Sequence, residues 1–205
     1  MRIALFGGTF DPPHRGHIAI AKAAANAFAL DRVLFAPTGL QPLKLGRAPS
    51  PFETRLTLAK AACEEDPRFE ATGIDAPHPD GSANYTVDTL TELARLYSAD
   101  TLFNLVGADS FLNLRKWREP DRLLELAEWI AVSRPGYALM EEDLVPLRLS
   151  QGQRSRVHVL NGIAEDTSAT DLRKRLREGD PCRDLLPNAV AAYVKRSNLY
   201  RNVVD

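Results

Sequence analysis

Short apolar runs alternate with amphipathic helical patterns along the whole chain, and this alternation most constrains the fold. The runs at residues 3–6, 33–36 and 101–106 are typical of buried parallel strands, which carry apolar side chains on both faces. Two later runs, at 129–133 and 157–160, have the same character. We therefore predict an α/β fold with a Rossmann-like, doubly wound, mostly parallel sheet and helices on both faces.

Apolar residues spaced three and four apart predict the helices between these strands. The first helix runs from His17 onward, and others lie at 87–97 and 120–127. Ser50 and Glu53 form the pattern of a capping box, with Pro51 at the first helical position of another helix.

The remaining segments give weaker signals. A third strand is expected near residues 69–74, and the charged stretch 138–156 reads as a surface loop or an irregular helix. Ser168 and Asp171 occupy capping positions of a later helix with Gly179 after its end, and Pro187 starts one more.

Composition and charge exclude several functional classes. The 205 residues are 44% hydrophobic, enough to bury one core, and 26 basic residues against 27 acidic ones give a net charge of −1. Such a chain has no overall field that attracts nucleic acid or an anionic membrane, so any phosphate binding must be local.

Compartment is inferred from the cysteines and from the apolar runs. Cys63 and Cys182 sit in no zinc-ligand pattern, and the helical spacing makes Cys63 a core residue rather than a reactive thiol. No apolar run is long enough for a membrane span or a signal peptide. We expect a cytoplasmic protein.

The segment 7–17, GGTFDPPHRGH, joins the first strand to the first helix and carries the strongest chemical signal. It has neither the Walker pattern nor the GxGxxG spacing of dinucleotide folds. Instead it offers two imidazoles, His14 and His17, with Gly16 between them leaving room for an anion. Because a helix N-terminus attracts phosphate through its N–H groups and its dipole, we expect phosphate chemistry here.

Two other interpretations of the histidine pair are weaker. A zinc site would need a third ligand or an HExxH pattern, and neither is present nearby, so no metal ligands are assigned. Two surface histidines without a role remain an alternative only if the rest of the chain carries no related signal.

Other segments of the chain do carry signals related to that of segment 7–17. Segment 7–17 resembles the GGTFDPxHxGH signature of bacterial nicotinate mononucleotide adenylyltransferases, members of the HxGH nucleotidyltransferase superfamily. Four more segments resemble that family's elements in its order: NYTVDTL at 84–90, GADS at 107–110 with Trp117, RPG at 134–136, and TSAT at 167–170 with Arg173. Together they span nearly the whole chain.

The resemblance implies transfer of the adenylyl group of ATP to nicotinate mononucleotide, giving nicotinate adenine dinucleotide (deamido-NAD) and pyrophosphate. The nucleophile is the substrate's own anionic phosphate, so catalysis needs positioning and charge stabilisation rather than a protein nucleophile. Mg²⁺ is expected with ATP and needs few protein ligands. The resemblance also implies one domain, 1–205, with a C-terminal helical part from about residue 165 that carries a second phosphate-binding motif.

The resemblance also implies a set of site residues. Catalytic roles go to His14, His17, Lys44 and Arg173. ATP-binding roles go to Gly7, Gly8, Thr9, Phe10, Gly16, Gly107, Asp109, Ser168 and Thr170. The residues expected to bind the pyridine nucleotide are Tyr85, Thr86, Trp117 and Arg134, with the Trp117 indole stacking on the pyridinium ring.

Several of these roles have plainer alternatives. Ser168 and Thr86 can be ordinary helix caps, and Trp117 can be a core residue with no ligand. Lys44 can be solvated, with Arg47 as its substitute. Asp11 reads as a turn-forming residue.

The substrate and the activity also have alternatives. A related transferase acting on nicotinamide mononucleotide or phosphopantetheine stays open, as does a nucleotide-binding sensor without turnover. An oligomer is possible.

Overall fold

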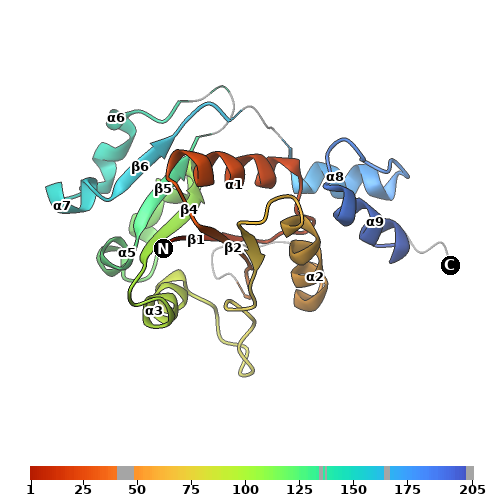
Figure 1. The fold of residues 1–205 in the computed structure, drawn as a ribbon, viewed down its shortest axis with the longest axis horizontal. Coiled ribbons are helices and arrows are strands. Elements are labelled where there is room, and N and C mark those ends of the chain that lie inside the picture. The colour runs from red at the N-terminus through yellow and green to blue at the C-terminus, as the bar shows by residue number, and fades with distance from the viewer. Residues whose placement is uncertain (41–48, 134–135, 137, 164–166, 202–205) are drawn as a thin grey trace.

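Six parallel strands form the central sheet of the protein, described here from a computed structural model that covers residues 1–40, 49–133, 136, 138–163 and 167–201. The strand order is β3-β2-β1-β4-β5-β6 (Figure 1). The strands are β1 (Arg2–Gly8), β2 (Arg32–Pro37), β3 (Phe69–Ala71), β4 (Thr101–Gly107), β5 (Glu128–Val132) and β6 (Val157–Leu160). Every neighbouring pair is parallel, which confirms the predicted doubly wound sheet.

Helices cover both faces of this sheet (Figure 1). The longer ones are α1 (Arg15–Ala27), α2 (Phe52–Cys63), α3 (Thr86–Leu96), α5 (Pro120–Leu126), α8 (Ala169–Arg177) and α9 (Asn188–Arg196). Short helices are α4 (Ala108–Phe111), α6 (Glu141–Leu144) and α7 (Gln151–Arg154), with 3₁₀ turns at Leu114–Lys116 and Val145–Leu147.

Successive residues of each strand feed two hydrophobic cores. In β1, Ala4 and Phe6 face the core formed with α1, α2, α8 and α9. Ile3 and Leu5 face the opposite core, formed with α3, α4 and α5. Each large apolar side chain buried this way contributes about 1.5–3 kcal/mol, so the near-continuous apolar runs of the sequence are explained by burial on both faces.

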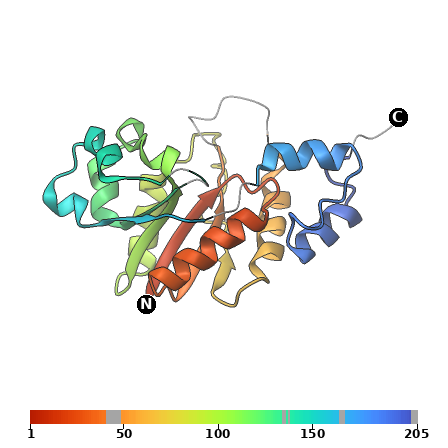
Figure 2. The ribbon, with the colours of Figure 1, turned by 90° about the horizontal axis from the view of Figure 1, so that it is seen from above.

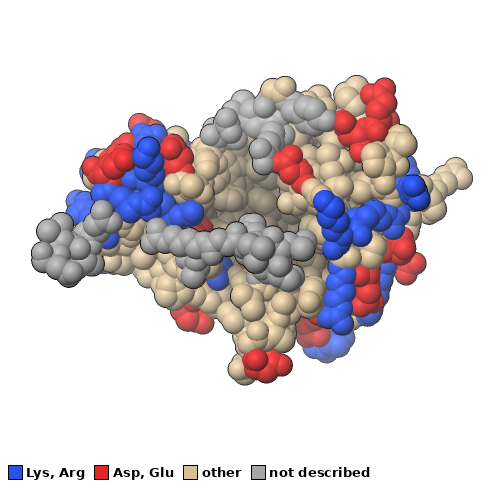
Figure 3. Space-filling view, turned by 180° about the vertical axis from the view of Figure 1, so that it is seen from behind, with Lys and Arg blue, Asp and Glu red and all other residues tan. Residues whose placement is uncertain are grey.

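The strand order switches between β1 and β4, at the centre of the sheet, where successive strands begin to be added on the opposite side. From β1 the chain moves to β2 and β3 on one side, and then returns to β4, β5 and β6 on the other. In Figure 2 the strands run away from the end where the N-terminus lies. Figure 3 shows the molecule from behind, with a hollow near the centre and Lys and Arg side chains gathered on both sides of it. Ligands of doubly wound folds bind at such a switch point, outside the carboxyl ends of the strands.

Two sequence predictions about element ends were wrong. Ser50 does not cap α2: the N-cap residue is Pro51, while the Ser50 N–H donates to Asp11 and its carbonyl accepts from Arg55. Strand β3 ends at Ala71 rather than near residue 74, because the Thr72 hydroxyl accepts the Ile74 N–H and turns the chain.

Two other segments agree with their predictions in outline. Helix α1 begins at Arg15, two residues before the predicted start, with His14 as its N-cap. The stretch 138–156 forms short, irregular helices, which agrees with the second of its two interpretations. Its side chains Leu139, Leu144 and Leu147 are nevertheless buried in the core on the α3 side. The charged composition of the stretch concealed this contribution to the core.

The Cys63 thiol and the lengths of the helices bear on reactivity and on membrane insertion. Cys63 is half-buried against the core on the α1 side, and burial, aided by Glu70, raises the pKa of its thiol to about 12. The thiol is therefore protonated at neutral pH, which agrees with the predicted core position, although Cys63 is only partly buried. Across the described ranges, no helix has both the length and the apolar character that crossing a membrane requires.

Candidate active site

The loop of residues 9–14 between β1 and α1, called the β1–α1 loop below, turns sharply at Phe10. This residue has φ of 49°, and its ring is 1% exposed, packed against Phe6 and Phe35. A Cβ at Gly8 would lie 3.0 Å from the Phe10 ring, so glycine lets the ring pass beneath the strand end. Phe10 therefore anchors the loop in the core, and its side chain is not available to a ligand.

The two histidines stack on each other at the start of α1. Their ring centroids are 3.7 Å apart, and His14 is only 7% exposed. The His14 N–H donates to Nδ1 of His17 over 3.2 Å. Because Nδ1 of His17 accepts a hydrogen bond, the proton of the neutral ring lies on Nε2, which makes Nε2–H a donor.

Burial controls the charge of His14. It lowers the pKa of the His14 imidazole to about 4, so the ring is neutral at pH 7. Within the described part of the chain, Nδ1 of His14 is buried and has no hydrogen-bond partner. Buried polar atoms are normally satisfied, so this nitrogen is an observation that points toward a bound ligand. The Arg15 N–H is already bonded to the Leu185 carbonyl at 2.9 Å, which leaves the first turn of α1 fewer donors for an anion.

The lowered pKa of His14 predicts a pH-dependent stability. Between pH 4 and 6.5 the unfolded chain binds a proton at residue 14 that the folded protein does not, so the free energy of unfolding rises with pH across that window. The full effect is about 3 kcal/mol, complete above pH 6.5 and lost as the pH falls toward 4. Urea unfolding of the parent and of His14→Gln at several pH values measures it. Equal slopes in the two proteins would contradict the assignment.

Helix α8 brings a guanidinium to the β1–α1 loop. Arg173 donates from Nη1 to the Asp11 carbonyl over 2.7 Å and from Nη2 to the Thr170 hydroxyl over 3.2 Å. Ser168 is the N-cap residue of α8, but its side chain makes no capping hydrogen bond. Its exposed hydroxyl, like that of Thr170, lies at the start of the helix. The first and last motifs of the sequence therefore meet in space, 162 positions apart.

The start of α3 lies beside the segment that carries Trp117. Tyr85 is the N-cap residue and Thr86 the first helical one, so Thr86 is not the cap. The Arg118 guanidinium lies over the Tyr85 ring at 4.7 Å. Trp117 is half-buried and meets Trp129 edge to face, with ring centroids 5.9 Å apart. Part of the Trp117 indole thus remains available for stacking.

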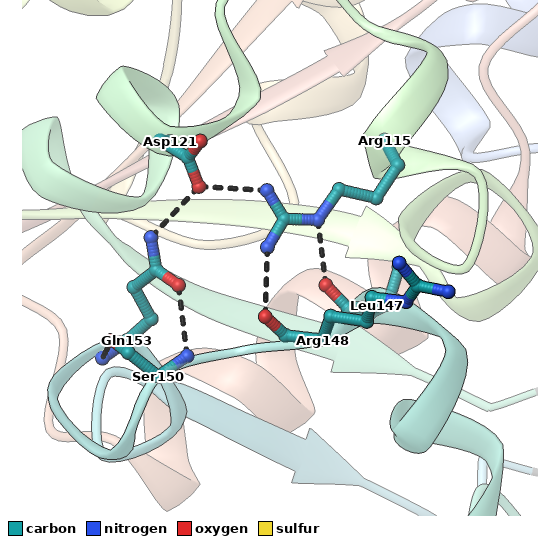
Figure 4. Close-up of polar contacts among 6 residues, drawn as sticks. All are labelled: Arg115, Asp121, Leu147, Arg148, Ser150 and Gln153. Carbon is teal, nitrogen blue, oxygen red and sulfur yellow. Dashed lines mark hydrogen bonds and ion pairs between the residues drawn. The ribbon is translucent and has the colours of Figure 1, made fainter.

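A hydrogen-bond network fixes the segment that precedes Trp117 (Figure 4). Arg115 donates to the carbonyls of Leu147 and Arg148, at 2.6 and 3.2 Å, and to Asp121 at 2.7 Å. Gln153 also donates to Asp121. The irregular stretch from α6 to α7 therefore supports the position of Trp117, which the sequence did not reveal.

Asn84 joins the start of α3 to the end of the β2 segment. Its Oδ1 accepts the Leu40 N–H at 3.0 Å, and its Nδ2 donates to the Ala76 carbonyl at 2.9 Å. A Cβ at Gly39 would lie 2.3 Å from that Oδ1, so the approach requires glycine. Asn84 therefore ties the turn before α3 to the segment that follows β2.

The remaining predicted site residues differ in their exposure, and three of them are not described. Gly7 and Gly107 are exposed at the carboxyl ends of adjacent strands, with open space around each, and Asp109 is exposed in the first turn of α4. Thr9 is half-buried, whereas Gly16 is buried in the first turn of α1. Lys44, Arg47 and Arg134 lie outside the described residues.

Sequence reasoning missed Asp11, Arg55 and Tyr200. The Asp11 and Arg55 side chains are 4% and 2% exposed, and the Tyr200 hydroxyl donates to Asp11. In the sequence, Asp11 resembles a turn-forming residue and Arg55 an ordinary helical arginine, so neither indicated that it is buried beside the β1–α1 loop. Among the described residues, no group of three or more His, Cys, Asp or Glu side chains could hold a metal ion.

Comparison with known proteins identifies the family of the chain. A profile of the cytidylyltransferase-like family matches residues 5–175. The chain is 42% identical over 97% of its length to a probable nicotinate-nucleotide adenylyltransferase of Roseiflexus, covering 98% of that protein. It is also 42% identical over 98% of its length to a Thermus thermophilus protein of the same name, covering 100% of it.

A solved structure shares the fold. The Plasmodium falciparum nicotinic acid mononucleotide adenylyltransferase complexed with NaAD superposes with a TM-score of 0.76 at 16% identity, with 97% of each chain covered. The sequence relatives, aligned over nearly their full length, extend the match from fold to family. The chain therefore belongs to the nicotinate-nucleotide adenylyltransferases, within the cytidylyltransferase-like family.

Proposed function

We propose that this protein transfers the adenylyl group of ATP to nicotinate mononucleotide in NAD biosynthesis. A phosphate oxygen of the mononucleotide attacks the α-phosphorus of ATP, and the bond from that phosphorus to the oxygen bridging the α- and β-phosphates breaks. The products are nicotinate adenine dinucleotide and pyrophosphate. The observation that carries the proposal is that Arg173 of α8 is bonded to the β1–α1 loop, which leads to the paired rings of His14 and His17 at the strand-order switch point.

Catalysis by this site rests on fixed donors rather than on proton removal. The attacking phosphate is already anionic at neutral pH, so no general base is required. Nε2–H of His17 supports a role as a donor to the α-phosphate, where negative charge develops. Arg173, with Ser168 and Thr170 at the start of α8, is suited to the leaving phosphates. In this proposal residues 1–205 act as one unit, with α8 as its second phosphate-binding part.

The mononucleotide has its own part of the site in this proposal. Trp117 stacks on the pyridinium ring, and the first N–H groups of α3, at Tyr85 and Thr86, donate hydrogen bonds to the ring carboxylate. Gly7, Gly8 and Gly107 allow close approach of the nucleotide backbone at the strand ends. Asp109 is suited to a ribose hydroxyl.

Mg²⁺ enters with ATP as part of the substrate. It binds phosphate oxygens and keeps several of its waters, so it needs few protein ligands. The donor set fits that role, because Nε2–H of His17 and the Arg173 guanidinium are donors suited to phosphate oxygens and would leave the ion to the phosphates. Both cysteines are free, which supports the reducing cytoplasm as the compartment.

Pyrophosphate release tests the function. Purified protein with ATP, Mg²⁺ and nicotinate mononucleotide is expected to release pyrophosphate and form the dinucleotide, with much slower release from nicotinamide mononucleotide. The reverse preference would assign the nicotinamide substrate and keep the mechanism. ATP binding without release from either substrate would contradict an enzyme and favour a sensor.

Arg118 is expected to contribute to the choice of the acid over the amide. Its guanidinium lies on the ring of Tyr85, at the start of α3, where the pyridine carboxylate is proposed to bind. Arg118→Gln is expected to lower kcat/KM for nicotinate mononucleotide about fivefold, the upper scale of one exposed charge contact, and to leave the value for the amide unchanged. Arg122→Gln is the matched control from the same segment. An equal loss for both substrates would contradict the prediction.

A further inference from the structure

A cluster of polar side chains holds the inner side of the β1–α1 loop. Its members are the side chains of Asp11, Arg55, Arg173 and Tyr200 and the backbone of Ser50, which come from four separate parts of the chain. Asp11 and Arg55 are almost fully buried, and Tyr200 reaches Asp11 from 189 positions away. The cluster lies between the loop and the core. Arg173 also has a proposed role on the ATP phosphates, whereas the proposed reaction gives the other members no direct role.

Both oxygens of the Asp11 carboxylate are occupied in this cluster. The Tyr200 hydroxyl donates to Oδ1 over 2.6 Å, and the Ser50 N–H donates to Oδ2 over 3.0 Å. Burial raises the pKa of the Tyr200 phenol, so the hydroxyl keeps its proton and remains a donor. Removal of that donor leaves a buried carboxylate oxygen unpaired, which is costly for the local structure.

The loop backbone is held at two further points. Arg55 donates from Nη1 to the Thr9 carbonyl over 3.0 Å and from Nε to the Ser50 carbonyl over 2.9 Å. Arg173 holds the Asp11 carbonyl from the other side. The loop is thus fixed by side chains of α2, of α8 and of the segment after α9, and His14 follows Asp11 by three residues.

Tyr200 adopts a backbone conformation that is uncommon for its residue type. Its φ is +69°, in the left-handed region that favours glycine. Residues held in that region persist where the surrounding structure determines them, and here the hydroxyl contact with Asp11 is such a determinant. The same conformation directs the side chain from the end of the described chain back to the β1–α1 loop.

We propose that Tyr200 is a positioning residue for the reaction: through Asp11 it fixes the β1–α1 loop and thereby the placement of His14 and His17 on the ATP phosphates. The inference rests on the proposed function. Tyr200 does not contact the phosphates itself. Loss of its hydroxyl therefore changes the positions of His14 and His17 and leaves the pyridine side of the site intact. Misplacement of reacting groups by a fraction of an ångström is enough to slow such a reaction strongly.

Tyr200→Phe tests this proposal, because it removes the hydroxyl and keeps the ring. We expect kcat to fall about tenfold, with KM for nicotinate mononucleotide within about twofold of the parent and the melting temperature lowered by only a few degrees. Tyr193→Phe on α9 is the matched control, since it removes a hydroxyl from the same region without reaching Asp11. It is expected to retain the parent's kcat.

A double-mutant cycle separates positioning from general damage. Asp11→Asn also lowers kcat, and adding Tyr200→Phe to it is expected to cause little further loss, because both act through one contact. Multiplied losses in the double variant, or parent-like kcat in Tyr200→Phe, would overturn the proposal.

Absence of pyrophosphate release from the parent would instead count against the proposed function. In that case the affinity of parent and Tyr200→Phe for a non-hydrolysable ATP analogue decides the positioning role, with equal affinities contradicting it.

Discussion

Replacing His17 with alanine is expected to lower kcat by about 10²- to 10³-fold with little change in the binding of nicotinate mononucleotide. Removal of one fixed donor to a developing oxyanion has effects of that size. His17 qualifies because its Nδ1 is used by the His14 N–H, which leaves Nε2–H as the donor. Steady-state pyrophosphate release at saturating ATP measures the change.

Two companion variants sharpen this test. His17→Gln places an amide donor near the position of Nε2, and partial recovery of kcat relative to alanine is expected. His158→Ala is the matched control, because His158 lies on β6 and pairs with Glu128, away from the loop. A His17→Ala protein with turnover within a few-fold of the parent would show that His17 has no part in the chemical step.

Replacing Arg173 with alanine is the second change with a large expected effect, a fall of about 10²-fold in kcat/KM for ATP. Charge-assisted bonds from a guanidinium to phosphate are about twice as strong as neutral ones, and the same side chain also holds the Asp11 carbonyl. The loss therefore combines a phosphate contact with a displaced loop. Steady-state kinetics with ATP as the varied substrate measures it.

The lysine variant distinguishes charge from geometry at this position. Arg173→Lys keeps the positive charge, but a single ammonium nitrogen cannot replace the two nitrogens that donate to Asp11 and Thr170. The lysine variant is therefore expected to recover only part of the kcat/KM lost in the alanine variant. Lys174→Ala, an exposed residue of the same helix, should match the parent. Full recovery by lysine, or parent-like kinetics in the alanine variant, would contradict the two-sided role.

The fold was predictable because burial on both faces leaves a direct mark in the sequence. The run at residues 3–6 is apolar at every position since β1 lies at the centre of the sheet, with a core on each side. Strand β3 pairs only with β2, at the sheet edge, and its three residues gave a weaker pattern whose end was predicted too far along the chain.

The site was predictable only where its residues are neighbours in sequence. The two histidines and the glycines of β1 lie in one segment, so their chemistry could be read together. Tyr200 and Asp11 are joined by a contact that no local pattern encodes. The Phe10 side chain points into the core because its backbone is left-handed, a choice that side-chain type does not reveal.

The central claim is that adenylyl transfer occurs where the β1–α1 loop meets the start of α8. A crystal structure of the protein with a non-hydrolysable ATP analogue and nicotinate mononucleotide tests it most directly. We predict the α-phosphate within hydrogen-bond distance of His17, a phosphate oxygen at Nδ1 of His14, and the pyridine ring on Trp117. A triphosphate bound elsewhere, with Nδ1 of His14 still unpartnered, would contradict the account.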